Sequence, residues 1–385
     1  MKKLIIISCF MLGITPLLMA QEYNKPALDS LTSRQSSSNS KAVKFLLTGY
    51  TQTTVMYVPD KEFTISALSF NPIFLWKPTA KIFFEGELEV ELEGEETAIG
   101  LEYANINYIL NRYMNFRVGK FLTPFGIYFD RLHPAWINRL PTAPLGYGHD
   151  GVGSSSELGI NVFGGIPIGP SKFNYSFYAI NGPQLNTGEE EPGEEGALMY
   201  GNTEDNNLNK AIGGRIGYLP LSNSSLEIGG SFMNAKVGTK DTGLENVRAN
   251  LLSVDLTYVK QLSFLKGFID IKGQWNSVKV DDATYTDWED DPTGNTPYTY
   301  KNERSTLWGQ LAYRPTLSKS KFVKNLELVY RYSFIDQPEG AKENEDIKQY
   351  TYGLNYWINF RSAMKFAVQS QEDETAYFVQ WALLF

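Results

Sequence analysis

The feature that most constrains this chain is a strict alternation of residue types over residues 84–92, Phe-Glu-Gly-Glu-Leu-Glu-Val-Glu-Leu. Every second position is a glutamate: Glu85, Glu87, Glu89 and Glu91. Because successive side chains of a β-strand point to opposite faces, this segment predicts a strand with carboxylates on one face and apolar groups on the other. One face must contact water, and the other must contact an apolar environment.

The same alternation recurs along the chain, and no segment after residue 42 follows a helical period. It predicts sixteen strands, near residues 43–58, 63–75, 80–92, 97–109, 114–121, 156–166, 172–181, 209–219, 226–237, 250–261, 268–278, 305–314, 325–335, 349–360, 364–371 and 376–385. Most have about ten residues, the length that a tilted strand needs to cross a bilayer.

The connections between these strands alternate in length. Short connections follow the even-numbered strands, whereas the long ones follow odd-numbered strands, at residues 122–155, 182–208, 279–304 and 336–348. Outer-membrane barrels have long outer loops and short periplasmic turns. A soluble β-sandwich would also bury one face of each strand, but it would not predict this alternation. The sequence therefore predicts an all-β fold, a transmembrane antiparallel up-and-down β-barrel.

Composition agrees with this prediction. The chain has 23 Tyr, 23 Phe, 7 Trp and 33 Gly among 385 residues, and after the first twenty residues it lacks the apolar runs of a helical multispan protein. Aromatic residues near expected strand ends, such as Trp76, Tyr108 and Trp381, fit the girdles at the two membrane interfaces. The excess of 43 Asp or Glu over 35 Lys or Arg argues against nucleic acid as a partner.

The first twenty residues have the pattern of a secretory signal peptide. Lys2 and Lys3 precede an apolar run over residues 4–19, and the run closes on Ala20, a small residue suited to cleavage. The single cysteine, Cys9, lies inside this run. A lipoprotein signal ending at Cys9 is the alternative, although it would shorten the apolar run to about five residues.

Three regions are thus expected: a signal peptide at 1–20, a flexible periplasmic tail at 21–42 and an outer-membrane barrel at 43–385. The tail is polar and rich in serine. No cysteine remains after cleavage at residue 20, so stability must come from backbone pairing and burial rather than disulfides.

Two segments resemble known outer-membrane proteins. Residues 376–385, with Tyr377, Trp381 and the terminal Phe385 on one face of an alternating strand, resemble the C-terminal signal that the barrel assembly machinery recognises. Residues 117–126, Arg-Val-Gly-Lys-Phe-Leu-Thr-Pro-Phe-Gly, resemble the strand-to-loop segment of the phosphate-selective porin O/P-like family of bacterial outer-membrane porins.

This resemblance implies a porin in the bacterial outer membrane, with about sixteen strands, commonly a homotrimer, in contact with outer-membrane lipid and lipopolysaccharide and without a cofactor. It implies passive diffusion of small hydrophilic solutes, with anions such as phosphate among them. The family folds its third outer loop inward, and here the third long connection is residues 122–155. The chain departs from the phosphate-selective pattern because it has no run of closely spaced arginines and carries the glutamates of residues 85–91.

The residues expected at a pore constriction form two sets of opposite charge: Arg117, Lys120, Arg131, His133 and Arg139 on the basic side, and Glu85, Glu87 and Glu89 on the acidic side. Residues 112–139 contain five Lys or Arg against one acid, Asp130, in a chain that is otherwise acidic. In one interpretation these cations attract anions into the pore. In the other they pair with the glutamates and leave little net selectivity.

Two further groups carry weaker signals. The acidic loops at 182–208 and 281–291 could bind divalent cations, but Glu189, Glu190 and Glu191 lack the spacing of a calcium loop, so we interpret both as solvated surface loops. Only two histidines exist, His133 and His149, and a histidine beside serines in one loop does not define a catalytic triad. We therefore expect no enzymatic activity and no metal. A barrel without an open channel, serving as an adhesin or in a surface complex, is the alternative to a pore.

Overall fold

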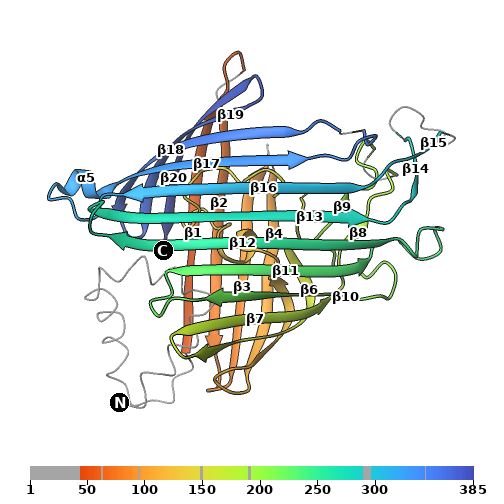
Figure 1. Cartoon of the computed structure of the whole chain (residues 1–385), viewed down its shortest axis with the longest axis horizontal. Coiled ribbons are helices and arrows are strands. Elements are labelled where there is room, and N and C mark those ends of the chain that lie inside the picture. The colour runs from red at the N-terminus through yellow and green to blue at the C-terminus, as the bar shows by residue number, and fades with distance from the viewer. Residues whose placement is uncertain are drawn as a thin grey trace.

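The computed structural model describes residues 44–61, 64–93, 96–147, 151–189, 192–288, 296–342 and 344–385. The expected signal peptide and periplasmic tail lie outside these ranges. Within them, sixteen strands form one closed antiparallel barrel (Figure 1). No helix in this part of the chain is long and apolar enough to span a membrane.

The barrel strands, in order around the wall, are β1 Lys44–Tyr57, β2 Thr64–Lys77, β3 Ile82–Glu93, β4 Glu96–Ile109, β5 Asn115–Leu122, β6 Ser156–Ile168, β7 Ser171–Ile180, β10 Ala211–Leu219, β11 Leu226–Lys236, β12 Arg248–Leu262, β13 Gly267–Val280, β16 Glu303–Arg314, β17 Leu326–Asp336, β18 Ile347–Asn359, β19 Ser362–Gln371 and β20 Glu374–Leu384. All sixteen predicted strands are confirmed, with ends that differ by a few residues. The alternation of long and short connections is confirmed with them.

Short elements inside the connections escaped prediction. Two small sheets form between β8 Gln184–Leu185 and β9 Leu198–Met199, and between β14 Thr284–Thr286 and β15 Pro297–Thr299. Two helices, α4 Tyr128–Arg131 and α5 Lys321–Asn325, span one turn each. Elements of two to five residues contain too few positions to show a period, so only their tertiary contacts define them.

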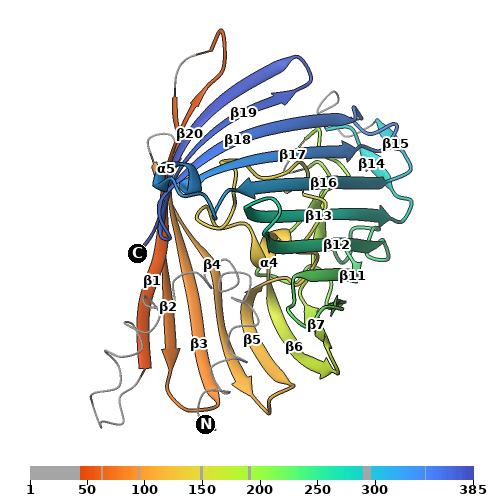
Figure 2. The ribbon, with the colours of Figure 1, turned by 60° about the vertical axis from the view of Figure 1, so that its left-hand side comes forward.

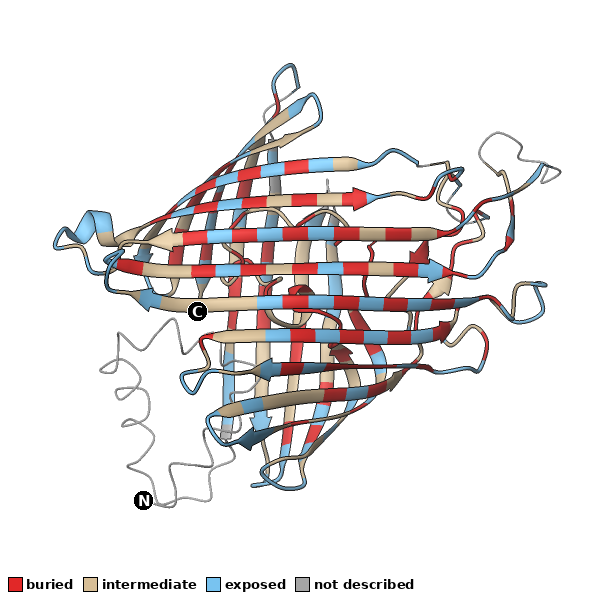
Figure 3. Cartoon of the chain, viewed as in Figure 1, coloured by how far each residue is buried: buried red, intermediate tan, exposed pale blue. Residues whose placement is uncertain are grey.

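Exposure alternates along most of the strands in the sense opposite to that of a soluble protein (Figure 3). On β12, Leu252 and Val254 are each 54% exposed, whereas the adjacent Asp255 is fully buried. The outer surface of the wall is therefore apolar and the interior is polar. A bilayer satisfies such an outer surface, because lipid solvates apolar side chains while the closed sheet pairs the backbone groups.

Aromatic side chains mark the membrane boundary on the side of the short turns. Trp76, Tyr108, Tyr218 and Trp381 are exposed close to the ends of β2, β4, β10 and β20 on this side. Their amphipathic rings suit the headgroup level of a bilayer.

The last residue closes the barrel. β1 pairs with β20 from Tyr50↔Leu384 to Tyr57↔Tyr377. The Phe385 amide continues this pairing by donating to the Gly49 carbonyl (2.9 Å), and its ring stacks on Phe70 of β2 with 5.3 Å between centroids. A Cβ at Gly49 would lie 2.7 Å from the Phe385 ring, so glycine makes room for it.

We expect Phe385→Asp to impair assembly of the barrel, because the variant places a charge on the lipid-facing side and removes the ring that spans β1, β2 and β20. The fraction of folded, heat-modifiable protein in the membrane measures this effect. Phe385→Tyr, which keeps the ring, serves as the control. A normal amount of the folded Asp variant would contradict the role assigned to this residue.

Candidate functional site

The connection between β5 and β6 enters the barrel. We call residues 123–155 the inner segment; its described part is residues 123–147 and 151–155. Figure 2 shows α4, which belongs to this segment, inside the ring of strands. Its contacts are with inward side chains of strands far from β5 and β6, so the chain crosses the interior before it returns to the wall.

The inner segment first reaches the wall at β11 and β13. The Gly126 amide donates to Ser231 Oγ (3.0 Å), and the Ile127 and Tyr128 amides both donate to Gln274 Oε1 (2.8 and 3.2 Å). Gly126 has a φ of +67°, and a Cβ there would lie 1.7 Å from the Gln274 side chain. Only glycine combines this backbone conformation with so close an approach.

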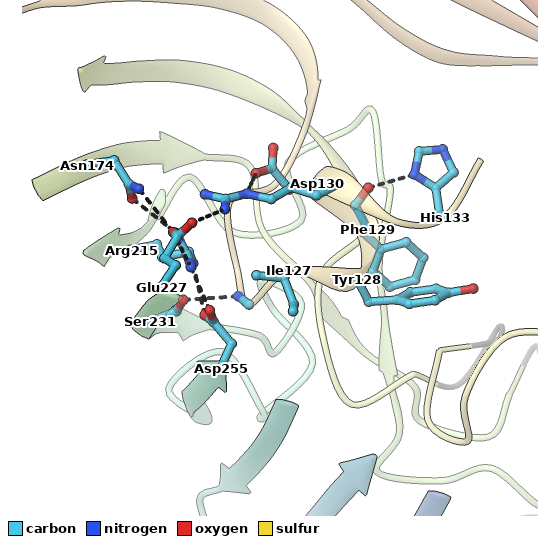
Figure 4. A network of polar contacts seen from close by, with 12 residues as sticks. Ile127, Tyr128, Phe129, Asp130, His133, Asn174, Arg215, Glu227, Ser231 and Asp255 are labelled. Atoms are coloured by element: carbon cyan, nitrogen blue, oxygen red, sulfur yellow. Dashed lines mark hydrogen bonds and ion pairs between the residues drawn. The ribbon is translucent and has the colours of Figure 1, made fainter. Parts of the chain in front are cut away.

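A charged network holds α4 against the wall (Figure 4). Arg131 donates to Glu227 of β11 (2.9 Å) and to its neighbour Asp130 (3.3 Å). Glu227 also accepts from Arg215 (3.0 Å), and Arg215 donates two hydrogen bonds to Asp255 (2.9 and 2.6 Å). Arg131, Glu227, Arg215 and Asp255 therefore form a row of alternating positive and negative charges. Arg131 is the first member of this row and faces the wall formed by β10–β12.

Arg139 makes a second, separate anchor. Its guanidinium donates to Asp270 of β13 (2.9 and 2.6 Å) and to Glu327 of β17. Asp270 also accepts from Lys272, and the Arg139 carbonyl accepts from Asn355 of β18 (2.8 Å). Burial opposes the positive charge of Arg139, but the Glu327 and Asp270 carboxylates outweigh it and raise the pKa of this guanidinium above its usual range.

Two cations of the wall bind backbone carbonyls of the inner segment. Lys365 of β19 donates to the carbonyls of Ala135 and Asn138, the latter at 2.7 Å. Arg331 of β17 donates to the Thr142 and Ala143 carbonyls, both at 2.8 Å. Because a lysine or arginine satisfies several carbonyls at once, these contacts supply hydrogen bonds to a buried segment that has little secondary structure of its own.

The inner segment packs closely against the wall between β13 and β17. Tyr128, Tyr147 and Trp308 form an aromatic cluster there, and Trp308 Nε1 donates to the Tyr147 hydroxyl (3.1 Å). A cavity beside Arg139 and Lys272 has a volume of about 10 Å³. This volume is close to the minimum that holds one water molecule, so the segment and the wall pack closely at this point.

The predicted glutamate row lies on the other side of the interior, on β3. Glu85 accepts from Asn107 (3.3 Å), Glu89 accepts from Asn71 (3.5 Å), and Glu87 is 1% exposed. Glu102 of β4 lies near them, and its carboxylate is 3.9 Å from His133 Nε2 of the inner segment. This part of the wall is rich in carboxylates.

The predicted basic residues thus occupy different places. Arg117 of β5 lies beside Glu85, with Nη2 and Oε1 3.3 Å apart, and also donates to Asn107 (3.0 Å). Lys120 shares the strand face of Val118, which is 55% exposed, and donates to the Leu101 carbonyl (2.8 Å). The structure therefore pairs Arg117 with Glu85 of the glutamate row and places Lys120 close enough to interact with the charge of Glu89, whereas Arg131 and Arg139 pair with carboxylates of other strands.

His133 adds no charge to this region at neutral pH. Its Nδ1 lies 2.6 Å from the Phe129 carbonyl, and burial lowers its pKa to about 4, although the Phe129 carbonyl and Asp130 favour the protonated form. The imidazole that faces Glu102 is thus neutral. His149 lies outside the described residues.

The interpretation of the acidic loops as solvated surface is wrong for Glu195. This residue is 2% exposed, and its carboxylate accepts from the Gly193 amide (3.2 Å) and the Tyr298 hydroxyl (3.1 Å). Glu195 thus connects the 182–208 loop to Tyr298 of β15. It is buried because these two distant loops pack against each other. Across the described part of the chain, no group of three or more His, Cys, Asp or Glu is arranged to hold a metal ion.

The partners that hold the inner segment were not predicted from the sequence: Glu227, Asp270, Glu327, Arg331 and Lys365. Each occupies an inward position of an alternating strand, so the strand pattern predicts that its side chain faces the barrel interior. The pattern does not distinguish these residues from the many other polar inward residues, because it does not say which of them face the inner segment.

Comparison with known proteins identifies the architecture. The chain is similar to Salmonella typhi OmpF in complex with daunomycin (TM-score 0.57, 12% identity, 89% of this chain and 98% of that chain). It is also similar to an anion-selective porin from Comamonas acidovorans (0.53, 13%, 89% and 100%). A third similar structure is the outer membrane channel DcaP of Acinetobacter baumannii (0.55, 13%, 90% and 99%). The fold is that of a bacterial porin. No protein-family model and no curated protein sequence matches the chain.

We expect Arg139→Met to loosen the inner segment, because the variant leaves Asp270 and Glu327 buried without their common partner. Removing one member of a buried ion pair costs about 3–5 kcal/mol. Limited proteolysis of the folded protein measures the loss as faster cleavage within residues 123–155. Arg112→Met, in a turn outside the barrel interior, is the matched control, and equal cleavage of the two variants would contradict the anchor.

The lowered pKa of His133 predicts a loss of stability in acid. As pH falls from about 6.5 to 4, His133 becomes protonated in the unfolded chain but stays neutral in the folded chain. The free energy of unfolding should therefore decrease by up to about 3 kcal/mol. Urea unfolding at several pH values, compared with His133→Gln, measures this difference. Parallel pH profiles for the two proteins would contradict the burial of a neutral imidazole.

Proposed function

We propose that the protein lies in the bacterial outer membrane and allows passive diffusion of small hydrophilic solutes. The observation that carries this proposal is the sixteen-stranded closed wall, apolar outside and polar inside. A barrel of this size is wider than wall side chains alone can fill, so its interior accommodates both an inner segment and water.

The packing of the inner segment supports one location for the aqueous path. The segment packs closely against β13–β17, with an aromatic cluster at Trp308 and a cavity of only about 10 Å³ beside Arg139. Solutes would instead pass between the segment and β3–β5, beside Glu85, Glu89 and Glu102. Contacts of the segment with β1 and β2 through Ala135 and Trp136 would bound this path at one edge.

The charges along this path favour cations rather than the anions that the basic segment suggested. Arg131 and Arg139 each donate to carboxylates of the opposite wall, and Arg117 is next to Glu85. The Glu89 carboxylate accepts from the Asn71 amide at 3.5 Å, and the Glu102 carboxylate faces a neutral imidazole. Lys120 interacts with both carboxylates, so one cation stands against two anions there. Carboxylates in a confined aqueous path attract cations, because salt screens them weakly there.

The assembly and its partners follow from the resemblance to porins. We propose a homotrimer in contact with lipopolysaccharide and outer-membrane lipid, inserted by the barrel assembly machinery that recognises Tyr377, Trp381 and Phe385. Exposure of these three side chains on the outer surface supports this proposal. We propose no catalytic activity and no cofactor.

Planar-bilayer recording tests the channel. Folded, heat-modifiable protein should give discrete conductance steps, and in a KCl gradient the reversal potential should indicate preference for K⁺. Folded protein without conductance would instead support a closed barrel, such as an adhesin.

We expect Glu89→Gln combined with Glu102→Gln to shift the reversal potential toward anions, because two carboxylates leave the aqueous path. Glu339→Gln combined with Glu345→Gln removes the same charge from the connection between β17 and β18 and is the matched control. Equal shifts in both double variants would mean that the path does not run beside β3 and β4.

A further inference from the structure

The two ends of the barrel carry opposite charge. The seven short connections, at 78–81, 110–114, 169–170, 220–225, 263–266, 315–325 and 360–361, contain seven Lys or Arg and no Asp or Glu. At the other end, the seven connections that do not enter the barrel contain 24 Asp or Glu against five Lys or Arg. We call the basic residues of the short connections the basic rim: Lys81, Arg112, Lys266, Lys319, Lys321, Lys324 and Arg361.

The basic rim lies next to the aromatic belt of the same end. Lys81 lies over the ring of Tyr108 (5.8 Å), and Arg361 lies over the ring of Phe360 (5.2 Å). Both rings are on the lipid-facing surface, 40% and 38% exposed. Because such rings sit at the boundary between hydrocarbon and headgroups, the cations are held at the depth of the lipid phosphates.

The longest of the short connections concentrates this pattern. Lys319, Lys321 and Lys324 surround α5, whose first turn is capped by the Ser320 hydroxyl. Phe322, between them, is 61% exposed, and its ring lies 5.5 Å from Tyr356 of β18. A short amphipathic turn with lysines around an exposed aromatic ring is suited to a lipid–water interface.

We propose that the basic rim binds the anionic headgroups of phospholipids in the leaflet on the side of the short turns. The cations come from five of the seven short connections, which follow β2, β4, β12, β16 and β18 and are distributed around the circumference except in the sector of β6–β11. A ring at one depth matches a planar surface that surrounds the barrel, whereas a single protein partner would need a patch on one side. Each lysine or arginine near an anionic membrane surface adds to the attraction.

The acidic connections at the opposite end complete the charge arrangement. Their excess of acids means that the net positive charge that attracts anionic phospholipid headgroups lies only at the end of the short turns. This attraction does not depend on whether the interior conducts ions. A negative result for lipid binding would therefore not contradict the proposed channel, and absence of conductance would not contradict lipid binding by the basic rim.

Quenching of tryptophan fluorescence by brominated lipids tests the proposal. Full-length protein is reconstituted in phosphatidylcholine vesicles that contain brominated phosphatidylglycerol or, in parallel, brominated phosphatidylcholine. We expect a preference of about twofold or more for the anionic lipid at low ionic strength, decreasing as salt is added.

Charge variants assign the preference to the rim. The triple variant Lys319→Gln, Lys321→Gln, Lys324→Gln should lower the preference, and the corresponding Lys→Arg triple variant should keep it. Glu339→Gln, Glu345→Gln and Asp346→Asn together change the charge of the opposite end by three units of the opposite sign, and this variant should not lower the preference.

Equal quenching by the two lipids in the wild-type protein would overturn the proposal. The proposal would also be overturned if the wild-type protein showed no lipid preference but bound isolated peptidoglycan, and the Gln triple variant did not bind it. The rim would then recognise a cell-wall polymer. A Gln triple variant that is fully folded and keeps the whole preference would equally exclude these lysines.

Discussion

Closure of the sheet is the constraint on which the rest of this structure depends. Pairing of β1 with β20 removes both sheet edges, so the wall can contact lipid without unsatisfied backbone groups. Once the wall is closed, the period of two places one half of the strand residues in lipid and the other half inside. All strand charges other than those near the membrane boundary must then share one interior.

That interior explains how the inner segment is held. Arg139 is anchored by Asp270 and Glu327, whose side chains are 2% and 1% exposed. A buried carboxylate without a partner is unfavourable, and so is a segment with unpaired carbonyls. The segment supplies cations to wall carboxylates, and wall cations such as Lys365 supply donors to segment carbonyls. The same exchange leaves the carboxylates of β3 and β4 without the loop arginines.

The sequence predicted the fold more fully than the candidate site. Sixteen strands followed from alternation, since the pattern at residues 84–92 is local and repeats elsewhere. The site was predicted only as two sets of charges. Pairing of the loop arginines with the row from Glu85 to Glu89 is expected because opposite charges attract. Attraction alone, however, does not determine which of the inward acids of a closed barrel an arginine pairs with.

By itself, the sequence determined the features that depend on neighbouring residues: the strands and the face of the sheet on which each side chain lies. It also determined the charge of each end of the barrel, because the short turns contain no Asp or Glu. Only the tertiary structure decided the ion pairs. Glu227 is 96 residues from Arg131, and Asp270 and Glu327 are 131 and 188 residues from Arg139. Such partners become neighbours only when the wall closes and the inner segment crosses it, and no local pattern encodes that distance.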